Sequence, residues 1–458
     1  MQPYMNSATS AISYPVISRR LANRVLLVLG ILGYVVIFQW VYITWLHYNY
    51  DYMGFAYNPP PADYLALSFC LSLLPGFFMP IKLLRPSQLI YWVLYLAVFI
   101  PAMFVPLYIA LQPASDVAML MISLFAGFLV TGCSYLFPLL RLRTSRLPKT
   151  VFWLGFAFVT LSLTAWVITV FRDHMRLVSL HNIYKEVRFA ADEVMVASSV
   201  GYAIMWLSSV FNPFLISWGL VHKRLSFLIA GVLGQVLIYS TVGAKSAILS
   251  IPILFLFYFV LRKHIDHFGL RLIWGVVAVF LLLNSINMVM GDISSGSLKM
   301  LSAIIFMRTF GMPGVLAGQY HAFFQDHPLT YLSHVNVVRL LQDYPYSNPV
   351  GIEIGNYFYG VDSQMNANVN FWITDGLAGF GLPGILLISL LCALVFWLLD
   401  STAKGHSPIF TALLVSFAAL NISNISLFTT LLSGGLGFCI LIFYLMPKDL
   451  FKNEMSIK

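Results

Sequence analysis

Apolar residues dominate long runs along almost the whole chain, and short polar segments separate these runs. Runs of about 17–25 residues have the length of an α-helix that crosses about 30 Å of hydrocarbon. Strands of a membrane barrel would instead be near ten residues long and alternate in polarity. The pattern therefore predicts an all-α polytopic membrane protein with about twelve transmembrane helices. These helices are predicted near residues 25–46, 64–81, 89–111, 117–140, 151–171, 200–221, 225–242, 246–261, 271–290, 371–399, 408–422 and 427–446.

A long interruption, residues 291–370, separates the ninth and tenth predicted helices. Its apolar part, Leu301–Phe324, is broken by charged residues, a glycine and a proline, so we expect two short helices at the membrane surface rather than a span. A third helix is predicted from Thr330 to Asp343, followed by a turn-rich platform over Tyr344–Asn370. A hydrophobic chain that keeps one large, partly helical loop out of the lipid is expected to place its function there.

Composition and charge agree with a membrane protein. The chain is 60% hydrophobic and 9% charged with a mean hydropathy of +0.84. When the loops are placed alternately on two sides, the N-terminal side has 18 Lys/Arg and 4 Asp/Glu, and the other side has 8 and 13. This bias predicts a cytoplasmic N-terminal side, and it explains the net charge of +9 without nucleic acid as a partner.

The resulting layout has five parts. Residues 1–24 form a cytoplasmic N-terminus, and residues 25–290 form helices one to nine with a basic periplasmic loop at 172–199. The large periplasmic loop follows, then helices ten to twelve over 371–446 and a cytoplasmic tail at 447–458.

Several chemistries lack their sequence motifs. The chain has no Gly-rich phosphate loop ending in Gly-Lys-Ser/Thr, no His-Glu-x-x-His, no Cys-x-x-Cys and no Asp-x-Asp. These absences disfavour nucleotide chemistry and metal-dependent hydrolysis. No charged residue is predicted at mid-span, which disfavours a transporter with a midplane charge relay.

Basic side chains are predicted at the outer membrane boundary instead: Arg172, Arg176, Arg188, Lys245 and Arg308. Guanidinium groups bind phosphate oxygens in pairs, and a partly desolvated lysine supplies a point charge, so this set suits a lipid-borne pyrophosphate. Two alternatives stay open. The segment after residue 172 is also typical of a solvated interfacial helix with Arg188 paired to Asp192, and Lys245 is also compatible with simple snorkelling.

Three asparagines, Asn366, Asn368 and Asn370, are two residues apart. In extended backbone they would share one face, with Ala367 and Val369 on the other. An amide both donates and accepts hydrogen bonds, which suits sugar hydroxyls. The alternative is a loop whose asparagines satisfy their own turns.

The sequence resembles the Wzy-type O-antigen polymerases, particularly their pseudomonad members. The residues that carry the resemblance are Tyr50–Gly54, Gly243–Lys245, Arg308–Phe310 followed by Gly318, Ile352–Ile354 and, most specifically, Met365–Phe371. The family has an Arg-x10-Gly pattern in two outer loops. This chain departs from it, with nine residues between Arg308 and Gly318.

The resemblance implies a GT-C-like, metal-independent and cofactor-free glycosyltransferase of the bacterial inner membrane. Such an enzyme joins undecaprenyl-pyrophosphate-linked oligosaccharide repeats on the periplasmic side, with inversion, and works with a chain-length regulator of the polysaccharide co-polymerase type. An O-antigen ligase of the same superfamily and a flippase for the same lipid-linked oligosaccharide are the alternative functions.

On this interpretation, Lys245 and Arg308 would hold the departing pyrophosphate, and the arginines of the 172–199 loop would guide either lipid carrier. Glu353 or His321 would take the acceptor proton. For Glu353 a salt bridge to a loop arginine is the alternative, and for His321 an interfacial polar role. The sugar would be bound by Arg339, the three asparagines and Asp51.

Overall fold

The computed structural model describes residues 14–142, 147–176, 199–290, 296–363, 365–447 and 450. Within these residues the chain is helical and contains no strand. The α-helices are α1 (Tyr14–Val41), α2 (His47–Tyr50), α3 (Ala62–Leu73), α4 (Ser87–Leu94), α5 (Ile100–Ile109), α6 (Ala114–Gly132), α7 (Lys149–Phe171), α9 (Val200–Trp206), α10 (Asn212–Val221), α11 (Leu225–Val242), α12 (Lys245–His264), α13 (Phe268–Met290), α14 (Gly296–Ser302), α15 (Met312–Asp326), α16 (Val350–Tyr359), α17 (Ala378–Ala403), α18 (Pro408–Ile422), α19 (Leu427–Leu432) and α20 (Leu436–Leu445). Five π-helical segments continue or join them: η1 (Tyr42–Leu46), η4 (Tyr95–Phe99), η7 (Leu207–Phe211), η10 (Ala303–Gly311) and η13 (Trp372–Leu377).

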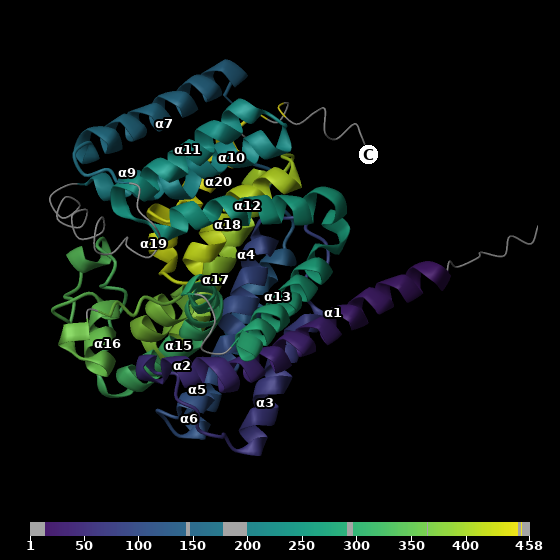
Figure 1. Cartoon of the computed structure of the whole chain (residues 1–458), viewed down its shortest axis with the longest axis vertical. Helices are drawn as coiled ribbons and strands as arrows, with labels where there is room; N and C mark the ends of the chain where they lie inside the picture. Colours follow the sequence, from purple (N-terminus) through teal and green to yellow (C-terminus); the bar gives the residue numbers. More distant parts are fainter. Residues whose placement is uncertain are drawn as a thin grey trace, which may run out of the picture.

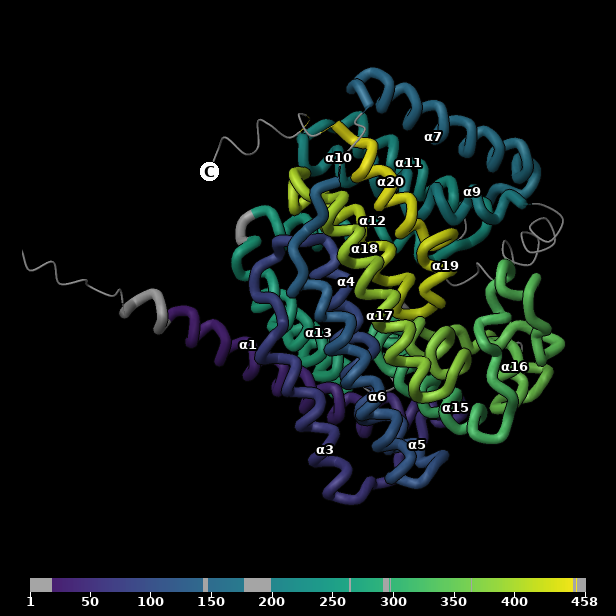
Figure 2. The backbone as a smooth tube through the Cα atoms, turned by 180° about the vertical axis from the view of Figure 1, so that it is seen from behind, coloured from purple at the N-terminus to yellow at the C-terminus, as the bar shows by residue number. Residues whose placement is uncertain are grey.

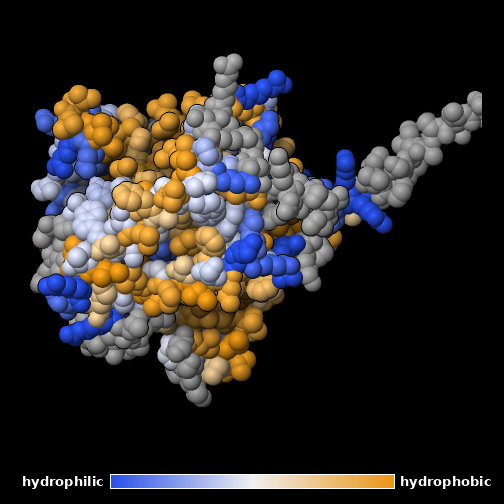
Figure 3. All heavy atoms as spheres, turned by 90° about the horizontal axis from the view of Figure 1, so that it is seen from above, coloured by the Kyte–Doolittle hydropathy of each residue, from blue (hydrophilic) through white to orange (hydrophobic). Residues whose placement is uncertain are grey.

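The described residues include eleven helices that are long and apolar enough to cross a membrane, which makes the chain a polytopic membrane protein. Each of the twelve ranges predicted from the sequence contains a helix, although the ranges 64–81 and 117–140 extend four and five residues beyond the helices observed there. Two of them, Ala62–Phe77 and Pro408–Ile422, are shorter than the other ten, and the eleventh long helix, Leu298–Asp326, was not predicted as a span. In Figure 3, orange apolar surface separates blue polar atoms at the left and right of the molecule.

Three long helical runs point in the same direction. The Tyr34 hydroxyl of α1 donates to the carbonyl of Leu96 (2.8 Å), and the rings of Tyr42 and Tyr108 are 5.0 Å apart, so α1 and the α4–α5 run are parallel. The contacts of α1 with α13 also advance together, because a side chain at Gly30 would meet Ile273 and the rings of Tyr34 and Phe280 have centroids 5.4 Å apart, so α13 runs in the same direction. We call the side on which α1, α5 and α13 end the site face. In Figure 1 this side is at the left, with α16, and α1 begins at the right (seen from behind in Figure 2).

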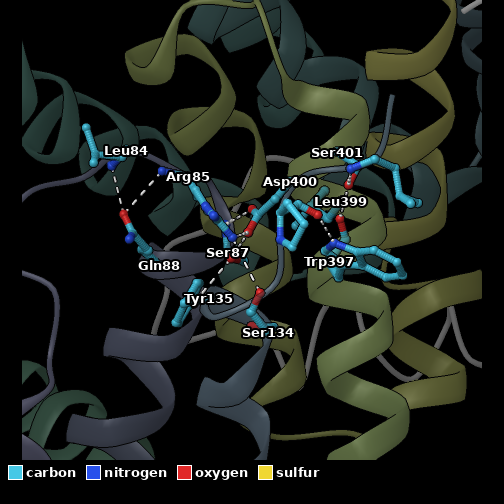
Figure 4. A network of polar contacts seen from close by, with 12 residues as sticks. Leu84, Arg85, Ser87, Gln88, Ser134, Tyr135, Trp397, Leu399, Asp400 and Ser401 are labelled. Carbon is cyan, nitrogen blue, oxygen red and sulfur yellow. Dashed lines mark hydrogen bonds and ion pairs between the residues drawn. The ribbon is translucent and has the colours of Figure 1, made fainter. Parts of the chain in front are cut away.

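The η13–α17 run connects the site face to the opposite face. At its far end Asp400 is buried and accepts two hydrogen bonds from Ser87, the first residue of α4: Ser87 N to Oδ1 (3.1 Å) and Ser87 Oγ to Oδ2 (2.7 Å). Arg85 Nη1 lies 4.0 Å from the same carboxylate (Figure 4). These contacts satisfy a backbone N–H of the kind that a helix start leaves unpaired.

The segment Leu301–Phe324 differs from the prediction of two short surface helices. It belongs to one continuous helical run, α14–η10–α15, from Gly296 to Asp326. The π-helical segment η10 ends at Gly311, and Met312 N bonds to the carbonyl of Met307, five residues back. This wider turn keeps the chain helical through Gly311 and Pro313. Such wide turns absorb helix interruptions that would otherwise end a helix.

Although this run is long enough to span, its contacts place both ends on the site face. It begins six residues after α13 ends, and Asn287 of α13 donates to Ser302 (2.8 Å). Near its middle, the ring of Phe310 lies 6.0 Å from that of Tyr34, well inside α1. At its other end His321 Nε2 is 3.1 Å from the carbonyl of Asp116, in the first turn of α6 just after α5. The run therefore dips into the bundle and returns.

The helix predicted from Thr330 to Asp343 is absent; only the short 3₁₀ turn Val338–Leu340 forms there. Tyr331 and Leu332 have left-handed backbone angles (φ 47° and 64°), which an α-helix excludes. The N–H groups of Thr330 and Tyr331 bond instead to the carbonyls of Ala378 (2.8 Å) and Gly379 (3.0 Å). Tertiary hydrogen bonds to the start of α17 thus override the local helical pattern.

The platform after residue 344 contains a helix that the sequence pattern did not predict, α16. It packs against the segment 365–369, and the hydroxyl of Tyr359 donates to the carbonyl of Met53 (2.8 Å) in the loop after α1. The first loop and the platform therefore meet on the site face.

Candidate functional site

A pocket of about 280 Å³ opens on the site face, where the turn after α15, the start of α16, the segment 365–370, η13 and the start of α19 meet. Its lining residues are His334, Asn336, Arg339, Tyr344, Ser347, Asn348, Pro349, Val350, Gly351, Asn368, Val369, Thr374, Ile425, Ser426 and Thr429. Amides and hydroxyls make up half of this set. Arg339 and Asn368 are the two sequence-predicted site residues among them.

The asparagine segment alternates as predicted over most of its length. Asn366 and Asn368 are exposed, and Ala367 and Val369 are buried. Asn370 departs from the pattern, because its side chain is fully buried. Its Oδ1 accepts from Trp372 N (3.1 Å), and its carbonyl accepts from Thr374 N (2.9 Å), so Asn370 starts the η13 turn. Its buried position sets Asn370 apart from the exposed Asn366 and Asn368, and its predicted contact with sugar stays a prediction.

Two glycines of α16 allow the asparagine segment to lie directly on this helix. A side chain at Gly351 would meet the amide oxygens of Asn366 and Asn368 at 2.6 and 2.7 Å, and one at Gly355 would meet the carbonyl of Met365 at 1.9 Å. Ala367 N also donates to the Gly351 carbonyl (2.8 Å). The close approach fixes Asn368 at the pocket wall.

Arg339 lines the pocket, and Glu353 lies behind the lining residue Asn348. The guanidinium of Arg339 lies 5.1 Å from the ring centre of Tyr344, whose hydroxyl donates to the Asn348 carbonyl (2.9 Å). Glu353 is half-buried and accepts from both Asn348 N and Asn348 Nδ2, each at 2.9 Å. Burial, followed by the negative charge of Glu353, raises the pKa of Tyr344 to about 12, so its hydroxyl stays protonated at neutral pH.

A buried contact between a histidine and an aspartate, which the sequence did not predict, lies at the inner wall. His334 Nε2 is 2.9 Å from Oδ1 of Asp375, which is fully buried in η13. The other oxygen of Asp375 accepts from Leu427 N (2.6 Å), the first residue of α19. The available signal was an aspartate only a few residues into a long apolar run, where a charge needs a partner.

Lys245 and Arg176 lie at neighbouring positions. Lys245 starts α12 directly after the tight turn at Gly243, and it is half-buried. The backbone N–H of Arg176 donates to the Ser240 carbonyl (2.9 Å), near the end of α11. Arg172 is exposed, and its Nε donates to Asp173 Oδ2 (3.1 Å). None of these three residues lines the pocket.

The remaining predicted residues lie outside the pocket lining. Arg308 is an exposed residue of η10, and Asp51 is exposed in the first loop, with Oδ1 3.6 Å from His47 Nδ1. His321 is 6% exposed and faces α6, and neither it nor Glu353 lines the pocket. Arg188 lies outside the described residues.

No family model matches the chain, and no curated protein or solved structure matches it either. The resemblance to Wzy-type polymerases therefore stays a prediction from the motifs.

Proposed function

We propose that this protein is an O-antigen polymerase, a metal-independent inverting glycosyltransferase that joins undecaprenyl-pyrophosphate-linked repeats at the periplasmic face of the inner membrane. The observation that carries the proposal is the pocket, which brings Arg339, Asn368 and several neutral hydrogen-bonding groups together beside the membrane helices. Amides and hydroxyls suit the hydroxyls of a sugar, and Tyr344 offers an aromatic face.

In the proposed reaction, a hydroxyl of the acceptor repeat attacks the anomeric carbon of the growing chain. The new C–O bond forms as the bond to the pyrophosphate breaks, and the pyrophosphate leaves with the electron pair. Cations such as Lys245 and Arg308 would stabilise the charge that develops on this leaving group, and the acceptor proton would pass to Glu353 or His321. The GT-C-like fold, the lipid-linked substrates and the chain-length regulator belong to the same proposal.

The lipopolysaccharide of a deletion strain tests the proposal on a gel. We expect a core that carries a single repeat and the loss of all longer species. A naked core with lipid-linked polymer would indicate a ligase, and repeats that accumulate on the cytoplasmic leaflet would indicate a flippase. Purified protein that lengthens lipid-linked repeats in detergent would establish the chemistry directly.

A further inference from the structure

Both ring nitrogens of His334 are engaged in the pocket wall. Nε2 faces the carboxylate of Asp375 at 2.9 Å, and Nδ1 lies 3.3 Å from the hydroxyl of Thr330. The histidine side chain is 11% exposed, and this exposed part lines the pocket, whereas the carboxylate behind it is fully buried.

The hydrogen-bond donors and acceptors around His334 indicate which of its ring nitrogens carry protons. The hydroxyl of Thr330 donates its single hydrogen to the carbonyl of Ala378 (3.0 Å), so toward Nδ1 its oxygen accepts. On the other side, an ionised carboxylate only accepts, and Asp375 also receives the N–H of Leu427. The Leu427 N–H and the imidazole ring both face this carboxylate, and donors in these positions favour its ionised form. With the carboxylate ionised, His334 would be an imidazolium that donates from both nitrogens.

The charge that faces the pocket is consequently positive. Arg339 and His334 line it, and none of its lining residues is acidic. Two carboxylates close to the lining, Asp375 and Glu353, are bonded within the protein to His334, Leu427 and Asn348, and Asp343, beside the lining residue Tyr344, is exposed. A wall of this kind attracts an anion, because the guanidinium and the imidazolium can both donate charge-assisted hydrogen bonds to it. Their positive charges also make the electrostatic potential in the pocket favourable for an anion.

We propose that this pocket binds an anionic group of the substrate, and that His334, held as an imidazolium by Asp375 and Thr330, is the second cation of the site beside Arg339. The proposed function offers two sources for that anion: the diphosphate of the lipid carrier and the carboxylate of an acidic sugar. The choice of these two sources rests on the proposed function, whereas the binding of an anion does not. On this view His334 positions charge and does not accept the acceptor proton.

The test uses the full-length protein in detergent and three probes: inorganic pyrophosphate, glucuronate and galactose. Binding is measured by calorimetry for the unaltered protein and for R339Q and H334Q. Gln at 334 keeps a donor toward Asp375 but removes the cation. The control is K82Q, because Lys82 forms an exposed ion pair with Asp266 away from the pocket lining (3.0 Å). We expect one anion to bind at least 5-fold more weakly to both pocket variants and equally to K82Q, with galactose unaffected.

The responding probe identifies the source: pyrophosphate indicates the carrier, and glucuronate indicates an acidic sugar. Nitrogen NMR of ¹⁵N-histidine-labelled protein gives a second measurement that needs no substitution at the site, and we expect both nitrogens of His334 to be protonated at neutral pH. In D375N the ring should become neutral while the amide still accepts from Leu427. The inference is overturned if neither anion binds, if R339Q or H334Q binds the anion as tightly as the unaltered protein, or if His334 is neutral in the unaltered protein. None of these results depends on the lipopolysaccharide ladder, so the proposed polymerase function succeeds or fails separately.

Discussion

At the scale of single residues, the sequence was sufficient for features that depend only on neighbouring residues in the chain. The alternation of Asn366 to Val369 and the position of Lys245 at a hairpin tip follow from local periodicity, and the structure has both. His334 was missed because its importance comes from Asp375, which is 41 residues away. Likewise, only the fold shows that the side-chain oxygen of Asn370 accepts a hydrogen bond from Trp372 N at the start of η13.

Charge removal at the predicted pyrophosphate site is the first residue-scale prediction. Lys245→Ala and Arg308→Ala should each abolish long-chain polymer and leave single-repeat lipopolysaccharide, because the leaving group would lose several kcal/mol of stabilisation in a water-poor site. A lipopolysaccharide gel from complemented deletion strains measures the result, with the K82A strain as the control. Normal chain lengths in both variants would remove these residues from the mechanism.

Close packing of α16 gives a second residue-scale prediction. Gly355→Ala would place a methyl group against the Met365 carbonyl, and overpacking of this kind costs about 1–3 kcal/mol. We expect a lower Tm and loss of polymer. Gly275→Ala is the matched control, because nothing lies within 4 Å of a side chain at that position of α13. Equal Tm values for the two variants would show that the asparagine segment does not rest on α16.

At the scale of elements, hydrophobic periodicity was sufficient for the spans and insufficient for the large loop. The length of the apolar runs was sufficient to predict the long helices of the membrane bundle other than Leu298–Asp326. The segment after α15 has a helical pattern, yet its N–H groups bond to carbonyls of α17, so no local rule predicts its turns. The continuity of α14–η10–α15 was hidden because a π-helical turn tolerates the glycine and proline that normally end a helix.

The junction of α4 and α17 carries an element-scale prediction. Asp400→Ala should leave Ser87 N and its hydroxyl buried without their acceptor, which costs about 1–3 kcal/mol. Thermal unfolding in detergent should show a clearly lowered Tm. Lys82→Ala, which removes an exposed ion pair on the short connector before α4, should change stability by less than about 1 kcal/mol. A D400A protein as stable as K82A would mean that this junction contributes little to the fold.

At the scale of the whole molecule, the directions of the helices place the C-terminal ends of α1, α5 and α13 on one face. Both ends of the α14–α15 run lie on the same face. The charge bias of the sequence predicts that these helix ends face the periplasm. The long helix Leu298–Asp326 leaves this prediction unchanged, because the run returns to the side from which it enters.

Cysteine labelling tests this topology. In a chain whose four cysteines are replaced, M290C and Q325C should react with an impermeant maleimide from the same side of the membrane, and K82C should react from the other. The side that labels M290C is expected to be the periplasm. Labelling of M290C and Q325C from opposite sides would mean that the run crosses the bilayer, and the pocket would then lie on the wrong side for the proposed substrates.

The bonds of Asp375 also have a consequence for biogenesis. Its carboxylate joins a turn of the large loop to the first residue of α19, which is translated 52 residues after Asp375. The pocket is thus assembled only after α19 has been synthesised. Until α19 enters the membrane, a nascent chain holds one oxygen of that carboxylate without its amide partner, so the pocket stays incomplete although every residue of the large loop has already been made.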